Sequence, residues 1–347
     1  MTIRSVLSIG FIILVLFPAF AQEPANAIDS SLIPAAPLFR DPVLDGPADP
    51  TVFWNYEEQN WWMIYTQRRA NVRSFNLAWV HGTEIGVASS NDGGITWLYR
   101  GTLPLAVEPG HNTYWAPEVI RHNGEYHLFV SFTRGFPTEN FDDVHRIAYL
   151  KGSDLWNLSF VEFSDLNSTR VIDPSIIQLA DGTWRMWFKH ENAGYVTHYA
   201  DSPNLRQWTP QGPAIGDVMC EGANVFRWQD AYWMITDPWH GIDLFRSDDA
   251  QQWTLQRTIL DDKGQRQDDT APGHHACVVP NGEYAYVFYH VNPEESFAPT
   301  SNWVTSTYQE RRSVIQVARL RLENGKVICD RDVPFPLVMP NAPETDD

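Results

Sequence analysis

Three carboxylates in the sequence have the residue type and the setting that acid–base chemistry requires. Asp49, Asp173 and Glu221 each open a short apolar run, so a buried strand is expected to follow each of them. Burial beside like charges drives proton affinities apart, which leaves one carboxyl group ionised and another protonated. Hydrolysis of an acetal needs such a pair, because a base activates water while an acid protonates the leaving oxygen. Taken singly, each residue is weak support, since Asp-Pro is a common turn opener.

Two further polar residues, Glu118 and His274, lead comparable stretches of the chain. The five lead residues, at positions 49, 118, 173, 221 and 274, are spaced 69, 55, 48 and 53 residues apart. After each comes an apolar run, a turn, a strand rich in Trp or Tyr, and a further pair of strands. The turns include Asn-Gly at 123–124 and 281–282 and Asp-Gly at 181–182, which are hairpin signals.

This repeat predicts the fold class. Four short strands in a unit of roughly 50 residues are the signature of a β-propeller, and no long stretch has a helical period. We therefore predict an all-β chain that forms a five-bladed β-propeller with four antiparallel strands per blade. Two separate all-β domains are the alternative, which the unbroken repeat through the middle of the chain disfavours.

Propeller geometry brings the lead residues together. The first strand of each blade lines the central axis, so the five lead residues should converge at one mouth of the channel. Loops between second and third strands share that face, and three of them are long, at roughly 67–83, 133–145 and 290–312. Long loops on one face of a rigid scaffold usually build a binding site. Candidate substrate contacts are Arg68, Arg69, Trp115, Glu118, His190, Asp237, His240 and His275.

Four segments at these positions resemble the motifs of glycoside hydrolase family 43. They are residues 49–52, 114–119, 172–175 and 221–223, and their order along roughly 45–330 matches the family. Families 32, 68 and 117 are related five-bladed propellers. The resemblance implies that Asp49 is the general base, Glu221 the general acid, and Asp173 the residue that orients the substrate and raises the pKa of the acid. It also implies inversion, with water attacking opposite the leaving group.

Some residues depart from the family pattern. Glu118 stands where the family more often has Asp, and Ala223 where it has Pro. The neighbours Ala48, Ile172 and Gly222 differ from the patterns of families 32 and 68, which use the first-blade Asp as a nucleophile. These neighbours favour inversion, while the exact family and the sugar stay open.

The resemblance also extends to a metal. Gly273-His274 resembles the Gly-His of family 43, where the His often helps to hold a calcium ion or its water in the axial channel. We therefore name His274 as a candidate metal residue and Ca²⁺ as the candidate cofactor. Calcium prefers oxygen ligands, so one His would act through water or as a minority ligand. The alternative is a channel His that is hydrogen-bonded to a carboxylate.

A different motif lies at residues 90–97, where the sequence fits the Asp-box of sialidases. This turn joins a third strand to a fourth, so it should lie on the face away from the lead residues. We interpret it as a hairpin clasp in which Ser and Asp satisfy turn amides and Trp packs between strands.

Composition limits the partners. The 347 residues include 25 Lys and Arg against 43 Asp and Glu, a net charge of −18. Such a chain lacks the basic face that a nucleic acid or an anionic membrane requires. Three cysteines are too few for a disulfide scaffold, and their odd number leaves at least one thiol free.

The N-terminus has the pattern of an export signal. Arg4 precedes an apolar run over 6–17, and Ala19-Phe20-Ala21 offers a small-x-small cleavage site. We predict a signal peptide over 1–21, a lead-in over 22–44, the propeller over 45–333 and a C-terminal tail over 334–347. The mature protein would be periplasmic or secreted, without a membrane anchor; an uncleaved anchor is the alternative.

These features together predict an exported, inverting glycoside hydrolase that acts on the ends of oligosaccharides. The alternative is a non-catalytic, lectin-like propeller in which the carboxylates only hydrogen-bond to sugar hydroxyls. A scaffold that binds proteins would need an apolar mouth, and the lead carboxylates make it the least favoured function.

Overall fold

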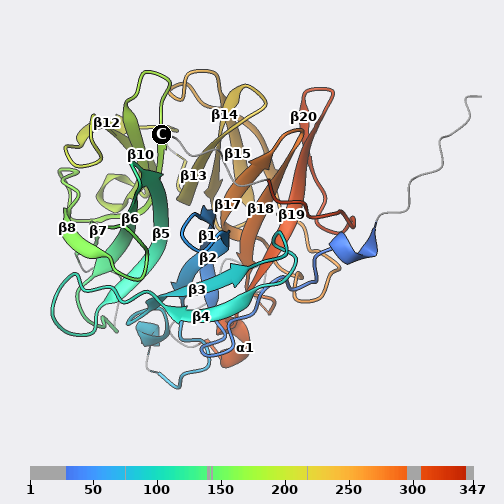
Figure 1. The fold of residues 1–347 in the computed structure, drawn as a ribbon, viewed down its shortest axis with the longest axis horizontal. Helices are drawn as coiled ribbons and strands as arrows, with labels where there is room; N and C mark the ends of the chain where they lie inside the picture. The colour runs from blue at the N-terminus through green and yellow to red at the C-terminus, as the bar shows by residue number, and fades with distance from the viewer. Residues whose placement is uncertain are drawn as a thin grey trace, which may run out of the picture.

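The computed structural model describes residues 29–74, 76–138, 141, 144–216, 218–294 and 306–340. Five antiparallel sheets of four strands each lie around a common centre, at which β1, β5, β13 and β17 gather (Figure 1). The predicted five-bladed β-propeller is thus confirmed. The predicted signal peptide lies outside the described residues.

Each blade is one contiguous stretch of chain whose strands pair in sequence order. Blade one is β1 (Pro47–Asn55), β2 (Asn60–Gln67), β3 (Glu84–Ser90) and β4 (Leu98–Thr102); blade two is β5 (Thr113–His122), β6 (Glu125–Thr133), β7 (Arg146–Gly152) and β8 (Ser159–Phe163). Blade three is β9 (Val171–Gln178), β10 (Trp184–His190), β11 (Val196–Ser202) and β12 (Thr209–Pro213). Blade four is β13 (Glu221–Trp228), β14 (Ala231–Asp237), β15 (Ile242–Ser247) and β16 (Thr254–Ile259); blade five is β17 (His274–Asn281), β18 (Tyr284–Val291), β19 (Val314–Glu323) and β20 (Lys326–Cys329). The short helices are η1 (Ser30–Leu32), η2 (Asn76–Trp79), η3 (Glu191–Ala193) and α1 (Tyr308–Arg311).

The first strands form the inner wall of the ring. Each of β1, β5, β9, β13 and β17 contacts the first strands of both neighbouring blades. Because the start of each first strand lies at the same mouth, residues that are far apart in sequence meet there.

Bulky side chains on the second strands fill the space between blades. Each second strand buries a large aromatic ring against the adjoining blade: Trp62, Phe129, Trp187, Trp233 and Phe288. Burying one such ring contributes about 1.5–3 kcal/mol relative to leaving it exposed. This packing makes the blades a rigid frame for the mouth.

Both ends of the described chain help to close the ring. Phe39 exchanges backbone hydrogen bonds with Ile315 of blade five, at 3.1 and 2.9 Å. At the other end Phe335, Leu337 and Met339 are buried in the cluster between blades five and one. The packed body therefore extends beyond both predicted propeller boundaries, 45 and 333.

The Asp-box turn forms a hairpin clasp, in agreement with the interpretation from sequence. Ser90 Oγ accepts from Gly94 N at 2.9 Å, and Asp92 Oδ1 accepts from Thr96 N at 2.9 Å. The Trp97 indole donates to Gly94 O at 2.9 Å. The motif closes the β3–β4 turn at the end of blade one opposite Asp49, since Ser90 pairs with Trp61, which in turn pairs with Trp54 at the far end of β1.

All three cysteines are free thiols, Cys220 and Cys277 being buried and Cys329 partly so. No disulfide therefore staples the propeller, and its stability rests on packing and polar networks within and between blades.

Asp269 is the centre of one such network, and its substitution should be costly. The fully buried carboxylate is 2.7 Å from Arg266 Nη2 and 3.0 Å from Arg331 Nη1, and accepts from Tyr289 OH at 2.9 Å. Asp269→Asn removes the charge that both guanidinium groups face, so we expect a loss of about 3 kcal/mol in unfolding free energy. Equilibrium guanidinium denaturation measures it. Asp248→Asn, at a side chain that is 79% exposed, is the control, and we expect it to change stability little; equal effects of the two substitutions would contradict the prediction.

Candidate active site

Each first strand carries a β-bulge at the level of the mouth. The register between first and second strands shifts there in all five blades. At every bulge one residue has a left-handed backbone: Asp49 (φ 50°), Ala116 (φ 43°), Asp173 (φ 60°), Gly222 (φ 59°) and His275 (φ 27°). A bulge releases a residue from the ladder and re-aims it, which is why bulges recur beside functional sites.

The sequence analysis placed the five lead residues at equivalent positions in their blades, and the bulges show that this prediction was only partly right. Asp49 and Asp173 do occupy the same position, but Glu221 precedes its bulge residue by one place and Glu118 follows its own by two. In blade five the bulge residue is His275 and not His274. A bulge adds one residue to a strand, and its position is not marked by the apolar residues that follow, so the sequence did not reveal these offsets.

A ring of second-strand side chains supports the bulges. In four blades a side chain accepts a hydrogen bond from the backbone N–H of the next blade's bulge residue. The pairs are Thr66 Oγ1 with Ala116 N (2.9 Å), Ser131 Oγ with Asp173 N (2.9 Å), Asp237 Oδ2 with His275 N (3.1 Å) and His290 Nδ1 with Asp49 N (3.3 Å). Blade three supplies a donor, Lys189, at the corresponding place.

Lys189 therefore binds a carboxylate in place of a backbone N–H. Its Nζ lies 2.7 Å from Glu221 Oε2, and the lysine side chain is only 7% exposed. Burial opposes ionisation of Glu221, but the Lys189 ammonium outweighs it and lowers the pKa of Glu221 to about 2. The pKa of Lys189 is raised above its ordinary value despite burial. In the free protein this pair is ionic.

The pKa of Asp173 is shifted in the opposite direction. Its Oδ2 accepts from Gly222 N at 3.2 Å, and the residue is 5% exposed. Burial raises the pKa of Asp173 to about 7, a shift that the carboxylates of Glu221 and Asp49 increase and that His275 and Lys189 oppose. The resemblance implied a raised pKa on Glu221; in the free protein the raised pKa is on Asp173, because Lys189 stabilises the Glu221 carboxylate.

Asp49 lies among cationic and imidazole groups on the other side of the mouth. Its Oδ1 is 3.3 Å from Arg68 Nη2, 3.4 Å from His275 Nδ1 and 3.7 Å from His290 Nδ1. Burial opposes protonation of His275, but the surrounding carboxylates, led by Asp49, raise its pKa above the ordinary value. These contacts fix the orientation of the Asp49 carboxylate.

Asp237 and His274 form a buried pair beneath the mouth. His274 Nδ1 is 3.1 Å from Asp237 Oδ2, the arrangement of a channel His held by a carboxylate. Among the described residues no group of three or more His, Cys, Asp and Glu side chains is placed to hold a metal ion. The side chains thus do not supply a set of direct ligands, so calcium remains a prediction from the resemblance and we derive no catalytic step through it.

Glu118 lies one layer deeper than the mouth. Its Oε1 accepts from Ile176 N of the next blade at 3.0 Å, as Ser175 Oγ does from Val225 N at 3.0 Å. Burial raises the pKa of Glu118 to about 8, and the bond from Ile176 opposes this shift. The geometry places Glu118 between blades and not beside the three carboxylates, in contrast to the predicted substrate contact.

Trp115 and Arg69 line the side of the mouth between blades one and two. The Trp115 indole donates to Val80 O at 2.6 Å, and its ring lies between those of His81 and His145, at 5.1 and 5.4 Å. Arg69 Nη1 donates to Ala78 O, and its guanidinium lies 5.0 Å from the Phe136 ring. Both side chains thus hold the long loops, and Trp115 remains partly exposed.

His190 and His240 lie at the periphery of the site. The His190 ring packs edge-on against His198 at 4.7 Å, and burial lowers its pKa. His240 is exposed, with Nδ1 2.7 Å from Pro238 O. Neither contact reaches Asp49, Asp173 or Glu221.

Lys189, Tyr195 and His290 are site residues that the sequence analysis did not select. Lys189 Nζ lies 5.2 Å from the Tyr195 ring and 5.4 Å from the Trp239 ring. A signal for Lys189 was present, because it is the one Lys or Arg at a second-strand position where the other blades have Thr66, Ser131, Asp237 and His290.

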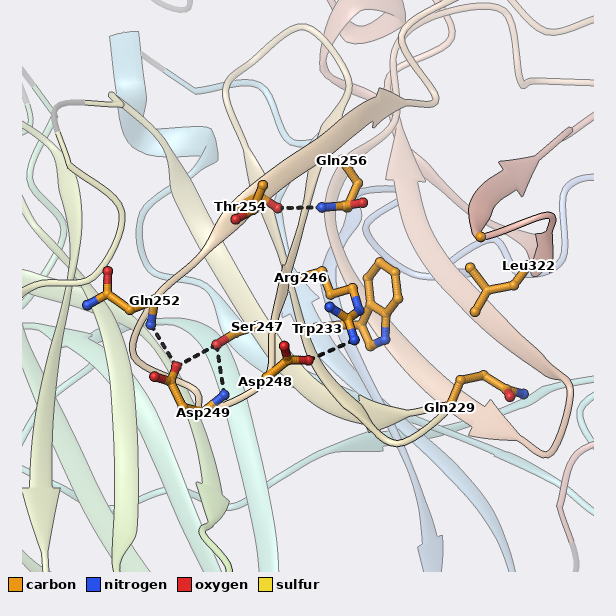
Figure 2. Close-up of a pocket in the computed structure, with 11 residues that line it drawn as sticks. Gln229, Trp233, Arg246, Ser247, Asp248, Asp249, Gln252, Thr254, Gln256 and Leu322 are labelled. Carbon is orange, nitrogen blue, oxygen red and sulfur yellow. Dashed lines mark hydrogen bonds and ion pairs between the residues drawn. The ribbon is translucent and has the colours of Figure 1, made fainter.

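A groove of about 680 Å³ lies elsewhere, between the outer parts of blades four and five (Figure 2). The hydrogen bonds drawn there belong mainly to the β15–β16 turn, in which Asp249 Oδ1 accepts from Gln252 N at 2.8 Å. Trp233 at this groove is buried, so the groove offers no exposed aromatic ring. None of its lining residues belongs to the mouth.

Among the described residues, no helix has the length and apolarity needed to cross a membrane.

Several solved structures with the same fold are named as glycosidases. The chain superimposes on the RS223 beta-xylosidase with a TM-score of 0.60 at 15% identity, covering 82% of this chain and 95% of that one. A beta-xylosidase/alpha-arabinofuranosidase from a compost microbial metagenome, solved with xylotriose, gives 0.58 at 15% identity, covering 85% and 97%. A thermostable family-43 glycoside hydrolase gives 0.58 at 17%, covering 89% and 100%. At these identities the likeness shows the fold.

Two sequence comparisons were informative in different ways. The search of curated protein sequences found no match to the chain. The sequence model of glycosyl hydrolases family 43 matches residues 99–307, more than half of the chain.

Proposed function

The chain belongs to family 43 of the glycosyl hydrolases and is a glycosidase that acts on O-glycosyl bonds, and from this premise we propose that it is exported and releases terminal sugars from oligosaccharides with inversion. The observation that carries the proposal is the meeting of Asp49, Asp173 and Glu221 at one mouth. Their protonation states differ, with Glu221 ionised beside Lys189 and Asp173 raised to a pKa of about 7.

In this proposal Asp49 is the general base. It removes a proton from a water molecule as the water oxygen bonds to the anomeric carbon. Arg68 and His275, at 3.3 and 3.4 Å, hold the carboxylate in a fixed orientation. A preoriented base of this kind contributes about 10²–10⁴-fold to the rate.

Glu221 delivers the proton to the leaving oxygen as the bond from that oxygen to the anomeric carbon breaks. The Glu221 carboxylate helps to raise the pKa of Asp173 to about 7, so near neutral pH a proton resides part of the time on Asp173 while Glu221 is ionised. Glu221 must be protonated to act as the acid, so a weaker contact with Lys189, which raises the pKa of Glu221, favours this role.

Loops that pack together along one side of the mouth support the proposal that the protein acts on the ends of oligosaccharides. The loops after β2 and β6 pack together, with Leu77 N donating to Thr138 O at 3.1 Å. Helix α1 joins them, since the Arg311 guanidinium lies 5.6 Å from the Trp79 ring of η2. A wall across blades five, one and two suits a pocket that admits a terminal sugar better than an open cleft.

The test is a screen of the mature chain, residues 22–347, with Glu221→Gln in parallel. The panel contains aryl glycosides, plant and algal oligosaccharides, and xylo- and arabino-oligosaccharides, which the structural neighbours suggest. We expect wild type to release single sugars of inverted anomeric configuration, read by NMR, and Glu221→Gln to be about 10²–10⁴-fold slower. Sugar binding by both proteins without turnover by either would instead favour the lectin-like alternative.

A further inference from the structure

One tryptophan differs from the rest of the described tryptophans. Trp239, on the loop after β14, is 40% exposed, whereas every other Trp in the described segments is buried or half-buried. Its ring lies 5.4 Å from Lys189 Nζ, which is 2.7 Å from Glu221 Oε2. The most solvent-accessible indole of the described residues therefore lies next to the lysine that binds the proposed acid.

Three more exposed apolar side chains lie on two neighbouring segments, at 195 and at 218–219. Tyr195 is 39% exposed, Val218 37% and Met219 56%. Met219 forms a bridge to Val196, and Cys220 N donates to Tyr195 O at 2.9 Å, so the segment before β13 runs alongside Tyr195. We call Tyr195, Val218, Met219 and Trp239 the acid-side patch.

Lys189 connects the patch to the acid. Its Nζ lies 5.2 Å from the Tyr195 ring and 5.4 Å from the Trp239 ring, and 2.7 Å from Glu221 Oε2. The two rings therefore flank the one ammonium that binds Glu221.

The backbone beneath both rings is strained. Tyr195 has φ 60° and Trp239 φ 64°, values that bulky residues rarely adopt. The Trp239 conformation is held by a 2.6 Å hydrogen bond from its N–H to Asp237 Oδ1. Strain that the surrounding structure maintains is typical of functional sites.

We propose that the acid-side patch binds the leaving-group part of the substrate, a sugar residue whose apolar face stacks on Trp239 and Tyr195. The inference rests on the proposed function, because a group that protonates the leaving oxygen must lie next to the leaving sugar. An exposed apolar patch beside buried polar groups is the usual composition of a ligand site. The substrate class is then an oligosaccharide cleaved between two sugars, and not a glycoside of a small alcohol.

The experiment compares two substrates of the same terminal sugar. A glycosyl fluoride has a leaving group too small to reach the patch, whereas the oligosaccharide identified by the panel fills it. For Tyr195→Ala and Trp239→Ala we expect the ratio of kcat/KM, oligosaccharide over fluoride, to fall at least tenfold. Leu98→Ala, which removes a 67% exposed side chain on β4, should leave the ratio unchanged. Equal losses on both substrates would overturn the proposal, because the patch would then contribute to steps that both substrates share and not to binding of the leaving sugar.

A binding measurement separates this proposal from the proposed function. Xylotriose and each oligosaccharide of the panel are titrated into Asp49→Asn, and tryptophan emission is recorded. We expect binding to change the emission, and the change to disappear in Asp49→Asn/Trp239→Phe while it persists in Asp49→Asn/Leu98→Ala. Binding with no contribution from Trp239 would overturn the patch even if hydrolysis is established. Emission changes without any hydrolysis would retain the patch as a sugar site and reject the proposed function.

Discussion

Asp49→Asn should abolish measurable turnover, with kcat/KM reduced about 10³-fold or more. Asn keeps the size of the side chain and its place on the β1 bulge, but it cannot accept the proton of the attacking water. The loss should be equally large for a glycosyl fluoride and an oligosaccharide, because water attack is needed for both. Steady-state hydrolysis of the two substrates measures it.

A comparison with Glu221→Gln makes this prediction specific. The acid is needed only for a poor leaving group, so Glu221→Gln should lose far more on the oligosaccharide than on the fluoride. Asp248→Asn removes a carboxylate from the groove between the outer parts of blades four and five and is the control for the loss of one charge. If Asp49→Asn also spared the fluoride, Asp49 would be a leaving-group residue and the assigned roles would have to be exchanged.

The fold could be predicted because its pattern is local and repeated. Each blade is contiguous, and its strands are bounded by turns such as Asn123-Gly124 and Asp181-Gly182. The period of about 50 residues fixes the number of blades, and the antiparallel order then fixes which loops share a face. Neither inference requires knowledge of a single side-chain contact.

The layers of the site could not be predicted with the same accuracy. The left-handed residues at the bulges are Asp49, Ala116, Asp173, Gly222 and His275, and only two of these are carboxylates. Both Asp173 and Glu118 precede apolar residues, yet Asp173 reaches the mouth while Glu118 bonds to Ile176 N between blades. Whether a carboxylate reaches the mouth or lies between blades depends on a displacement of one or two residues along its strand. The hydrophobic pattern of the sequence does not show this displacement.

The ionisation state of Glu221 could not be predicted from the sequence either. The resemblance names Glu221 but says nothing of the residue opposite it, and Lys189 comes from the preceding blade, 32 positions earlier. A backbone N–H usually meets an acceptor at that place in this chain. The substitution of a donor for an acceptor in one blade is what gives the pair its electrostatic character.

Lys189→Met should move the alkaline limb of the pH profile of kcat/KM upward by at least one unit. Methionine retains the apolar stem between Tyr195 and Trp239 but removes the ammonium that stabilises the Glu221 carboxylate. Burial then acts with less opposition and raises the pKa of Glu221 from about 2, so a protonated acid persists to higher pH. The pH dependence of kcat/KM reports groups of the free enzyme, which is the state in which Lys189 and Glu221 are paired.

Stability should respond to the same substitution, and this readout does not depend on turnover. In wild type the pKa of Glu221 lies below its unfolded value of 4.5, so its contribution is present above pH 4.5 and is lost as the pH falls toward 2. In Lys189→Met a raised pKa reverses the sign, and stability is lost as the pH rises above 4.5. The melting temperature of Lys189→Met relative to wild type should therefore fall between pH 4.5 and pH 8, whereas Lys189→Arg, which keeps the charge, should follow wild type in both measurements. If Lys189 acted only by packing, Lys189→Met would lower the melting temperature equally at every pH. The alkaline limb of kcat/KM would also stay in place, because the pKa of Glu221 would not depend on Lys189.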